Sequence, residues 1–174
     1  VFNVTVNGKT IENYLDTRTH GDVMISLRPP ADEWETTWRE NNRSHPLVKN
    51  WKFFGAGIVV NDCELATEYF LNLGFPLIKE VHESRDLGVK FCHLKVGSMM
   101  FELIQPITDN SVYKECFNMR GEGIVDMSFM VEELESEIES LVGKGAELLV
   151  ATNEFAVIDT RREGNTLIRL LNNV

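Results

Sequence analysis

The chain repeats one stretch of sequence, and this repeat restricts the possible folds more than any other feature. Residues 55–62 read Gly-Ala-Gly-Ile-Val-Val-Asn-Asp, and residues 126–133, which lie 71 positions later, read Asp-Met-Ser-Phe-Met-Val-Glu-Glu. The same offset relates Gly74 to Gly145, each of which closes the segment that follows its run. A repeat of this length predicts two copies of one supersecondary unit.

The two copies share one predicted order of elements, β-α-β-β-β. In the first copy, apolar spacing predicts a strand at 53–60, a helix with its apolar stripe at 65–73, strands at 75–82, 88–96 and 99–105, and a linking helix at 111–119. In the second copy it predicts a strand at 124–131, a helix at 133–143, and strands at 146–151, 155–159 and 166–171. We therefore expect an α+β fold in which paired βαβββ modules form a curled mixed sheet around a cleft.

The N-terminal part resembles an earlier, incomplete module. Residues 21–30 are similar to residues 97–106, and both stretches precede a helix-like segment, which is Asp32–Asn41 in the first case. Val1–Thr19 then fits two preceding strands. An unrelated N-terminal extension that contains a hairpin is the alternative. The predicted division is residues 1–49 for the incomplete module and 50–174 for the paired domain, with modules at 50–120 and 121–174.

Composition excludes several partners. A net charge of −10 repels phosphate backbones, so nucleic acid is not expected as a partner. No apolar run approaches the roughly 20 residues that span a bilayer, so no membrane association is expected. Cys63, Cys92 and Cys116 are odd in number and widely spaced, which favours free thiols and a cytoplasmic protein. Exposed edges among the N-terminal strands favour a homodimer. The chain begins at Val1 rather than Met, so an accessory domain of a longer polypeptide is a further hypothesis.

Four segments carry a resemblance to the vicinal oxygen chelate (VOC) superfamily of glyoxalases, bleomycin-resistance proteins and dioxygenases. They are Phe53–Asp62, Phe101–Pro106, Arg120–Asp126 and Gly164–Leu170. Within the superfamily, residues 50–174 look most similar to methylmalonyl-CoA epimerase. The resemblance implies the fold described above, but it specifies the reaction far less, because one fold hosts many chemistries.

The resemblance also implies a metal in the cleft, held by residues from the first and last strands of each module. Those positions are Gly55, Glu102, Asp126 and Arg169 in this chain, where the family usually has His, Gln or Glu, His, and Glu. Gly55 has no donor side chain, and Arg169 has no lone pair to offer. We expect a degenerate metal site and no cofactor. A divalent metal would have only Glu102 and Asp126 as weak ligands, completed by water and substrate oxygens.

Glu102, Asp126 and Arg169 suggest two alternatives to a metal. Two carboxylates whose pKa values are made different by one nearby cation are suited to acid/base proton transfer next to a carbonyl. In that case Glu102 is the base, Asp126 its partner, and Arg169 the group that stabilises an enolate. The other possibility is a structural salt bridge, in which Arg169 merely neutralises the two acids.

His93 is a further candidate, because strand alternation places it opposite Glu102 if it points inward with Val89 and Phe91. It would then be a base or a substitute ligand, whereas the alternative is an ordinary strand histidine. His82 begins a polar loop and is expected to face water. No role is predicted for His20 or His45.

The predicted function is an enzyme of the isomerase/epimerase or lyase type. It would act on a small carbonyl, carboxylate or acyl-thioester substrate by moving a proton, without the usual metal. The alternative is a non-catalytic module of the resistance type, which binds a small molecule in a metal-free cleft.

Overall fold

The computed structural model describes residues 2–27, 37, 40–41 and 50–173. Its first complete module contains β4 (Lys52–Val59), α3 (Cys63–Asn72), β5 (Leu77–Ser84), β6 (Val89–Val96) and β7 (Met99–Pro106), followed by the linker helix α4 (Val112–Arg120). The second contains β8 (Gly123–Val131), α5 (Leu134–Gly143), β9 (Glu147–Ala151), β10 (Phe155–Thr160), α6 (Arg161–Gly164) and β11 (Thr166–Asn172). The predicted βαβββ order is confirmed in both. The short helix α6 was not predicted.

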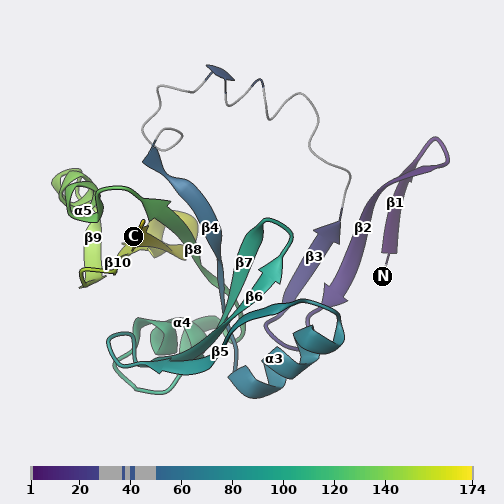
Figure 1. The fold of residues 1–174 in the computed structure, drawn as a ribbon, viewed down its shortest axis with the longest axis horizontal. Coiled ribbons are helices and arrows are strands. Elements are labelled where there is room, and N and C mark those ends of the chain that lie inside the picture. The colour runs from purple at the N-terminus through teal and green to yellow at the C-terminus, as the bar shows by residue number, and fades with distance from the viewer. Residues whose placement is uncertain (1, 28–36, 38–39, 42–49, 174) are drawn as a thin grey trace.

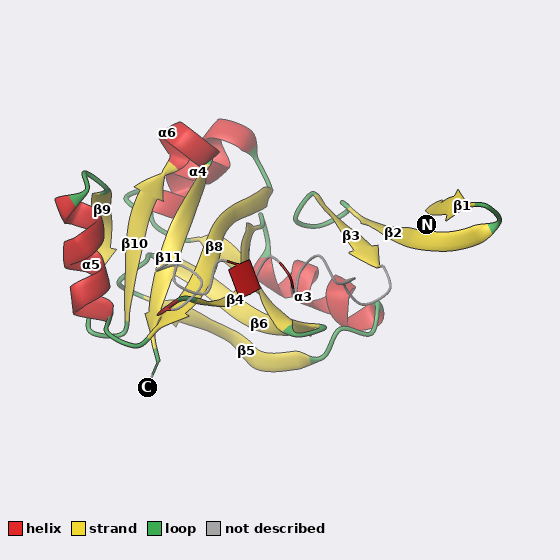
Figure 2. Cartoon of the chain, turned by 90° about the horizontal axis from the view of Figure 1, so that it is seen from above, coloured by secondary structure: helices red, strands yellow, loops and turns green. Residues whose placement is uncertain are grey.

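The two modules share one mixed sheet in the order β5-β6-β7-β4-β8-β11-β10-β9. In each module the first strand pairs in parallel with the last, β4 with β7 and β8 with β11, and the other pairs are antiparallel. The antiparallel pair β4–β8 joins the modules at the centre. The sheet bends there, so that β8, β11 and β10 run across the direction of β5 and β6 (Figure 2).

Each module helix covers the outer face of its own strands. α3 begins after an Asp62 N-cap that accepts a hydrogen bond from the Leu65 amide, and it buries Ala66 and Phe70 against β6 and β7. α5 buries Leu134 with Ala156 and Leu170. The linker helix α4 instead packs inside the bend, where Tyr113 and Cys116 fill one end of the concave face together with residues of both modules. All three cysteines are free, as predicted, and the structure buries each of them.

A separate three-stranded sheet, β1 (Phe2–Val6), β2 (Lys9–Thr17) and β3 (Val23–Leu27), confirms the strands predicted for the N-terminus. Figure 1 shows it projecting beside α3. Val23 and Ile25 join the core under α3, and both oxygens of Glu122 accept backbone hydrogen bonds, from Gly21 at 2.8 Å and from Asn61 at 2.7 Å. The predicted linker helix Asp32–Asn41 lies almost wholly outside the described residues.

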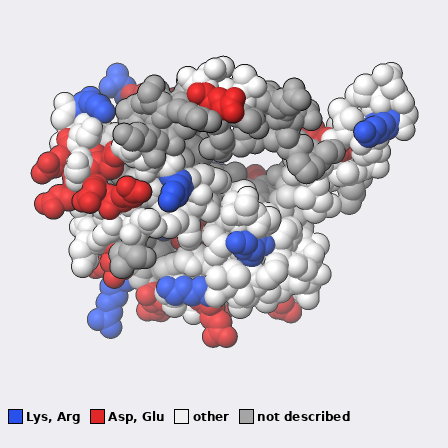
Figure 3. Space-filling view, turned by 45° about the horizontal axis from the view of Figure 1, so that its top comes forward, with Lys and Arg blue, Asp and Glu red and all other residues white. Residues whose placement is uncertain are grey.

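Acidic side chains gather around α5, at the left of Figure 3. Among the described residues, no helix has the length and apolar character needed to cross a membrane.

Candidate functional site

The central strands bring the predicted charged residues together. Glu102 on β7 lies beside Gly57 of β4, and Gly57 in turn lies opposite Asp126 of β8. Arg169 on β11 lies beside Ser128, two residues further along β8. Because side chains alternate along a strand, all of these positions face the concave side of the bend. The structure therefore confirms that Glu102, Asp126 and Arg169 form one cluster.

Glu102 and Arg169 form a buried ion pair, with only 2% and 4% of the two residues exposed. The pair joins Arg169 Nη2 to Glu102 Oε2. Ser128 Oγ supports it, accepting from Arg169 Nε at 3.1 Å and Nη2 at 3.0 Å. Burial lowers the pKa of Arg169 to about 10, so the guanidinium keeps its charge at neutral pH. The charges of Glu102 and Arg169 therefore mainly neutralise each other.

Asp126 belongs to the cluster but is sealed from solvent. Its carboxylate accepts hydrogen bonds from the Gly57 amide at 3.1 Å, Tyr113 Oη at 2.7 Å and Ser128 Oγ at 3.2 Å. Complete burial raises its pKa to about 6, although these three bonds oppose the shift. Burial and the neighbouring Asp126 carboxylate raise the pKa of Tyr113 as well. Helix α4 thus covers Asp126 on the side away from the open part of the bend.

His93 is the most accessible group of the cluster, with 15% of its side chain exposed. Its Nε2 lies 2.6 Å from Glu102 Oε1, as strand alternation predicted. Burial, Arg169 and Lys79 lower the pKa of His93 to about 4, so its imidazole is neutral at pH 7. A neutral ring that donates from Nε2 to a carboxylate has its lone pair on Nδ1. Among the described residues no protein group bonds to that Nδ1.

A cavity of about 290 Å³ opens onto this cluster. His93, Glu102 and Arg169 lie at its inner end, and its walls include Phe54, Phe91, Leu87, Phe155 and Leu171. Lys79, Ser84, Asp86, Glu154 and Asn172 also line it. The arrangement places the neutral His93 ring on a cavity that has room for a small molecule and is lined by both apolar and charged side chains.

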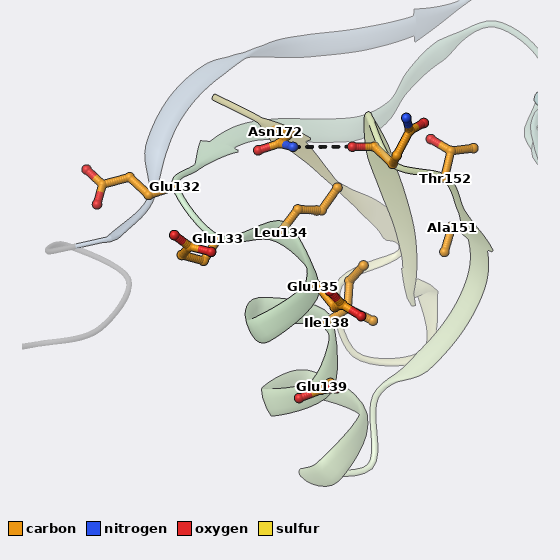
Figure 4. Close-up of a pocket in the computed structure, with 10 residues that line it drawn as sticks. Glu132, Glu133, Leu134, Glu135, Ile138, Glu139, Ala151, Thr152 and Asn172 are labelled. Atoms are coloured by element: carbon orange, nitrogen blue, oxygen red, sulfur yellow. Dashed lines mark hydrogen bonds between the residues drawn. The ribbon is translucent and has the colours of Figure 1, made fainter. Parts of the chain in front are cut away.

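A larger hollow of about 670 Å³ lies beside α5 and contains none of the predicted residues. Figure 4 shows its acidic lining, with Glu132, Glu133, Glu135 and Glu139 around Leu134 and Ile138. Asn172 donates to the carbonyl oxygen of Asn153 at 3.2 Å on its far side. These acidic side chains lie in or next to the first turns of α5, where the helix dipole favours negative charge.

One sequence-based expectation needs correction, because His82 does not begin a polar loop. It lies inside β5, half-buried, with its ring centroid 3.9 Å from that of Phe91. Its Nδ1 lies 2.8 Å from the Glu80 carbonyl oxygen, and its Nε2 is buried without a partner among the described residues.

The side chains present do not fit the metal that the family resemblance implies. Arg169 places a fixed cation against Glu102 and within 3.8 Å of Asp126. A side chain at Gly55 would begin 2.2 Å from the Met100 carbonyl oxygen, so this position has no room for a ligand. Among the described residues, no group of three or more histidines, cysteines or acids is arranged to hold a metal ion.

Sequence reasoning missed Ser128, Tyr113 and Lys79. Ser128 had a detectable signal, because it lies two residues after Asp126 on the same face of a strand and corresponds to Gly57 in the repeat. Tyr113 had none, since it comes from the linker helix and meets Asp126 only in three dimensions. Lys79 lies opposite His93 across an irregular strand pair.

The fold is shared with several solved structures. A methylmalonyl-CoA epimerase from Mycobacterium tuberculosis is 24% identical and superposes with a TM-score of 0.61 over 70% of this chain and 87% of its own. A hypothetical protein from Bacillus halodurans C-125 is 21% identical, with a TM-score of 0.61 over 72% and 96%. A variant of the Streptomyces coelicolor methylmalonyl-CoA epimerase, solved in complex with 2-nitronate-propionyl-CoA, is 17% identical, with a TM-score of 0.61 over 71% of this chain and 98% of its own.

No curated protein matches the sequence of this chain. One sequence family does, over residues 56–161, which run from β4 to the start of α6. Together with the paired βαβββ modules, this match shows that the chain belongs to the glyoxalase/bleomycin resistance protein/dioxygenase superfamily.

Proposed function

We propose that this chain is an enzyme that moves a proton on a small carbonyl or carboxylate compound or an acyl thioester. The reaction would be of the isomerase/epimerase or lyase type and would proceed without the family's metal. The observation that carries the proposal is the hydrogen-bonded line His93–Glu102–Arg169 at the inner end of a cavity with aromatic and charged walls.

The geometry favours His93 as the base. From the sequence alone, Glu102 is the first candidate for this role. Glu102 Oε1 lies against His93 and Oε2 against Arg169 and Ser128, so its carboxylate has little capacity left for substrate. Glu102 instead fixes the tautomer of His93 and directs Nδ1 outward. Arg169 is paired with Glu102 and would reach an enolate only through this pair. Asp126 sets the position of Ser128 and does not touch the cavity.

The proposed step removes a proton from the carbon next to the substrate carbonyl. The C–H bond breaks, the proton joins His93 Nδ1, and the electron pair moves into the enolate oxygen. Return of this proton by His93 regenerates the starting compound. A proton delivered from water to the opposite face gives the epimer, after which His93 releases its own proton to the solvent. Protonation of His93 is stabilised by the Glu102 carboxylate 2.6 Å away. The solved neighbours named as methylmalonyl-CoA epimerases support this reaction class for the fold.

The experiment is hydrogen exchange in D₂O, followed by proton NMR of methylmalonyl-CoA, phenylpyruvate and other carbonyl acids with an exchangeable α-hydrogen. Exchange catalysed by the wild-type chain should fall by about 10²–10⁴-fold in His93→Gln, the range expected when a general base is lost. His20→Gln is the matched control, because His20 packs on Tyr69 in the N-terminal part. Unchanged exchange in His93→Gln would exclude His93 as the base.

The second candidate is a binding module without catalysis. It is favoured by the way Glu102, Arg169, Asp126 and Ser128 satisfy one another, as in a structural network. A compound that raises the melting temperature but shows no deuterium incorporation would support this alternative.

A further inference from the structure

The floor of the cavity offers no free positive charge to a ligand. Arg169 lies there, but its Nη2 is paired with Glu102 and its Nε and Nη2 donate to Ser128. Its charge is therefore balanced inside the protein. Of the three cluster residues on the cavity, His93 is the most exposed, and its ring is neutral.

Lys79 is the remaining cation of the lining. It lies on β5 opposite His93 of β6, and its Nζ is 5.6 Å from the centre of the Phe91 ring. Among the described residues it forms no ion pair, in contrast to Lys90, which lies 2.9 Å from Glu64. Lys79 can therefore move its ammonium group toward a ligand without breaking a salt bridge.

Lys79 lies close enough to His93 to act on the charge of its ring. Burial, Arg169 and Lys79 all lower the pKa of His93, but Arg169 is balanced by Glu102, whose carboxylate also lies 2.6 Å from His93 Nε2. Lys79 is therefore the cation left to attract an anion among the described residues that line the cavity, which also include the acids Asp86 and Glu154. Aromatic side chains from three different strands enclose the same space, namely Phe54, Phe91 and Phe155.

We propose that Lys79 determines specificity by binding the carboxylate of a small ligand whose aromatic or branched apolar part packs among Phe54, Phe91 and Phe155. This inference rests on the proposed function for the identity of the site and names the class of substrate that the site accepts. The carboxylate lies between Lys79 and the mouth, and the carbon that carries the acidic hydrogen faces His93 Nδ1. The volume of about 290 Å³ admits one ring or a short branched chain.

The test compares three compounds of nearly equal shape by calorimetry: phenylacetate, phenylacetamide and 2-phenylethylammonium. Phenylacetate should bind at least about tenfold more tightly than the amide, because it gains a charge-assisted contact. The ammonium compound should bind most weakly. In Lys79→Gln the preference for phenylacetate over the amide should disappear, and in Lys79→Arg it should largely remain. Lys95→Gln, on β6 outside the cavity, is the matched control and should bind like the wild type.

Each other outcome overturns the proposal. Tighter binding of the ammonium compound would show that Asp86 and Glu154 control the mouth. A preference for phenylacetate that survives in Lys79→Gln would place the anion elsewhere, and absence of binding of all three compounds would exclude an aromatic carboxylate ligand. Binding is measured without turnover, so failure of the proposed catalysis, seen as unchanged exchange in His93→Gln, is distinguished from failure at Lys79.

Discussion

Arg169 and Glu102 face each other across the joint between the two modules, at positions that correspond in the repeat. Glu102 lies beside Gly57, Arg169 lies beside Ser128, and Gly57 and Ser128 are separated by the 71 residues of the repeat. Equivalent positions thus carry opposite charges, and their ion pair links β7 to β11 across the two central strands.

Removing Arg169 should cost more than a surface ion pair does. Arg169→Met leaves the Glu102 carboxylate buried without its cation, so the free energy of unfolding should fall by roughly 3–5 kcal/mol at pH 7. Urea unfolding at pH 7 measures this loss.

The double variant Arg169→Met/Glu102→Gln tests whether the cost comes from an uncompensated charge. It should recover most of the stability, since neither buried charge remains. Arg162→Met, at a side chain that is 94% exposed, should unfold like the wild type. If the double variant is as unstable as Arg169→Met, lost packing rather than charge explains the effect.

The ring of His93 should titrate near pH 4 in the folded chain, well below the 6.5 of a free histidine. A depressed histidine pKa contributes stability above pH 6.5, and this contribution is lost as the pH falls through 4. Replacing Lys79 by Gln removes one of the positive charges that depress it, so the pKa of His93 should rise. ¹⁵N-histidine NMR follows the ring directly. A titration near 6.5 in the wild type would contradict the proposed burial and charge at this position.

Asp126 should make the pH dependence of stability run in the opposite direction. Its folded pKa of about 6 exceeds the ordinary 3.8, so its contribution is fully present below pH 3.8 and is lost as the pH rises through 6. Asp126→Asn removes this loss. Relative to the wild type, its free energy of unfolding should therefore increase between pH 4 and pH 7, by on the order of 3 kcal/mol.

Tyr113→Phe provides the matched variant for Asp126. It removes the 2.7 Å hydrogen bond that stabilises the Asp126 carboxylate, so the pKa of Asp126 should rise further and the fall in stability should extend to higher pH. Chemical unfolding at half-unit pH steps resolves both curves. Identical pH profiles for the wild type and Asp126→Asn would show that this carboxyl does not titrate as described.

The contact between His93 and Glu102 could be predicted from sequence because a short turn fixes its register. The Gly97-Ser98 turn pairs Val96 with Met99, and counting back along the two strands brings His93 opposite Glu102. Strand alternation then places both side chains on the concave face. Local rules were sufficient here because the two strands are adjacent in sequence.

The remainder of the site depends on pairings between distant strands. β8 pairs with β11 in parallel, and no turn between them sets the register that places Arg169 beside Ser128. The register shifts on either side of the stretch in which Gly57 lies opposite Asp126 are likewise not visible in the sequence. The role of Tyr113 depends on how α4 enters the bend. Family resemblance located the charged cluster but not the groups that hold it.

Adding a methyl group at Gly57 or at Gly55 should destabilise the fold, for a different reason at each position. A Cβ at Gly57 would lie 2.6–2.7 Å from the carboxylate atoms of Asp126, whereas a Cβ at Gly55 would lie 2.2 Å from the Met100 backbone oxygen. Both Gly57→Ala and Gly55→Ala should lower the free energy of unfolding, by about 1–3 kcal/mol for an overpacked core and by more where backbone must move.

The background variant Asp126→Ala separates the two cases. It removes the carboxylate that obstructs a side chain at position 57, so Gly57→Ala should cost little in that background, while Gly55→Ala should cost the same in both. The double-mutant cycle is measured by urea unfolding. An equal cost of Gly57→Ala in both backgrounds would mean that Asp126 does not fill the space beside this glycine. A retained cost at Gly55 would also mean that a histidine cannot be installed there, so the family's metal set could not be rebuilt by side-chain substitution alone.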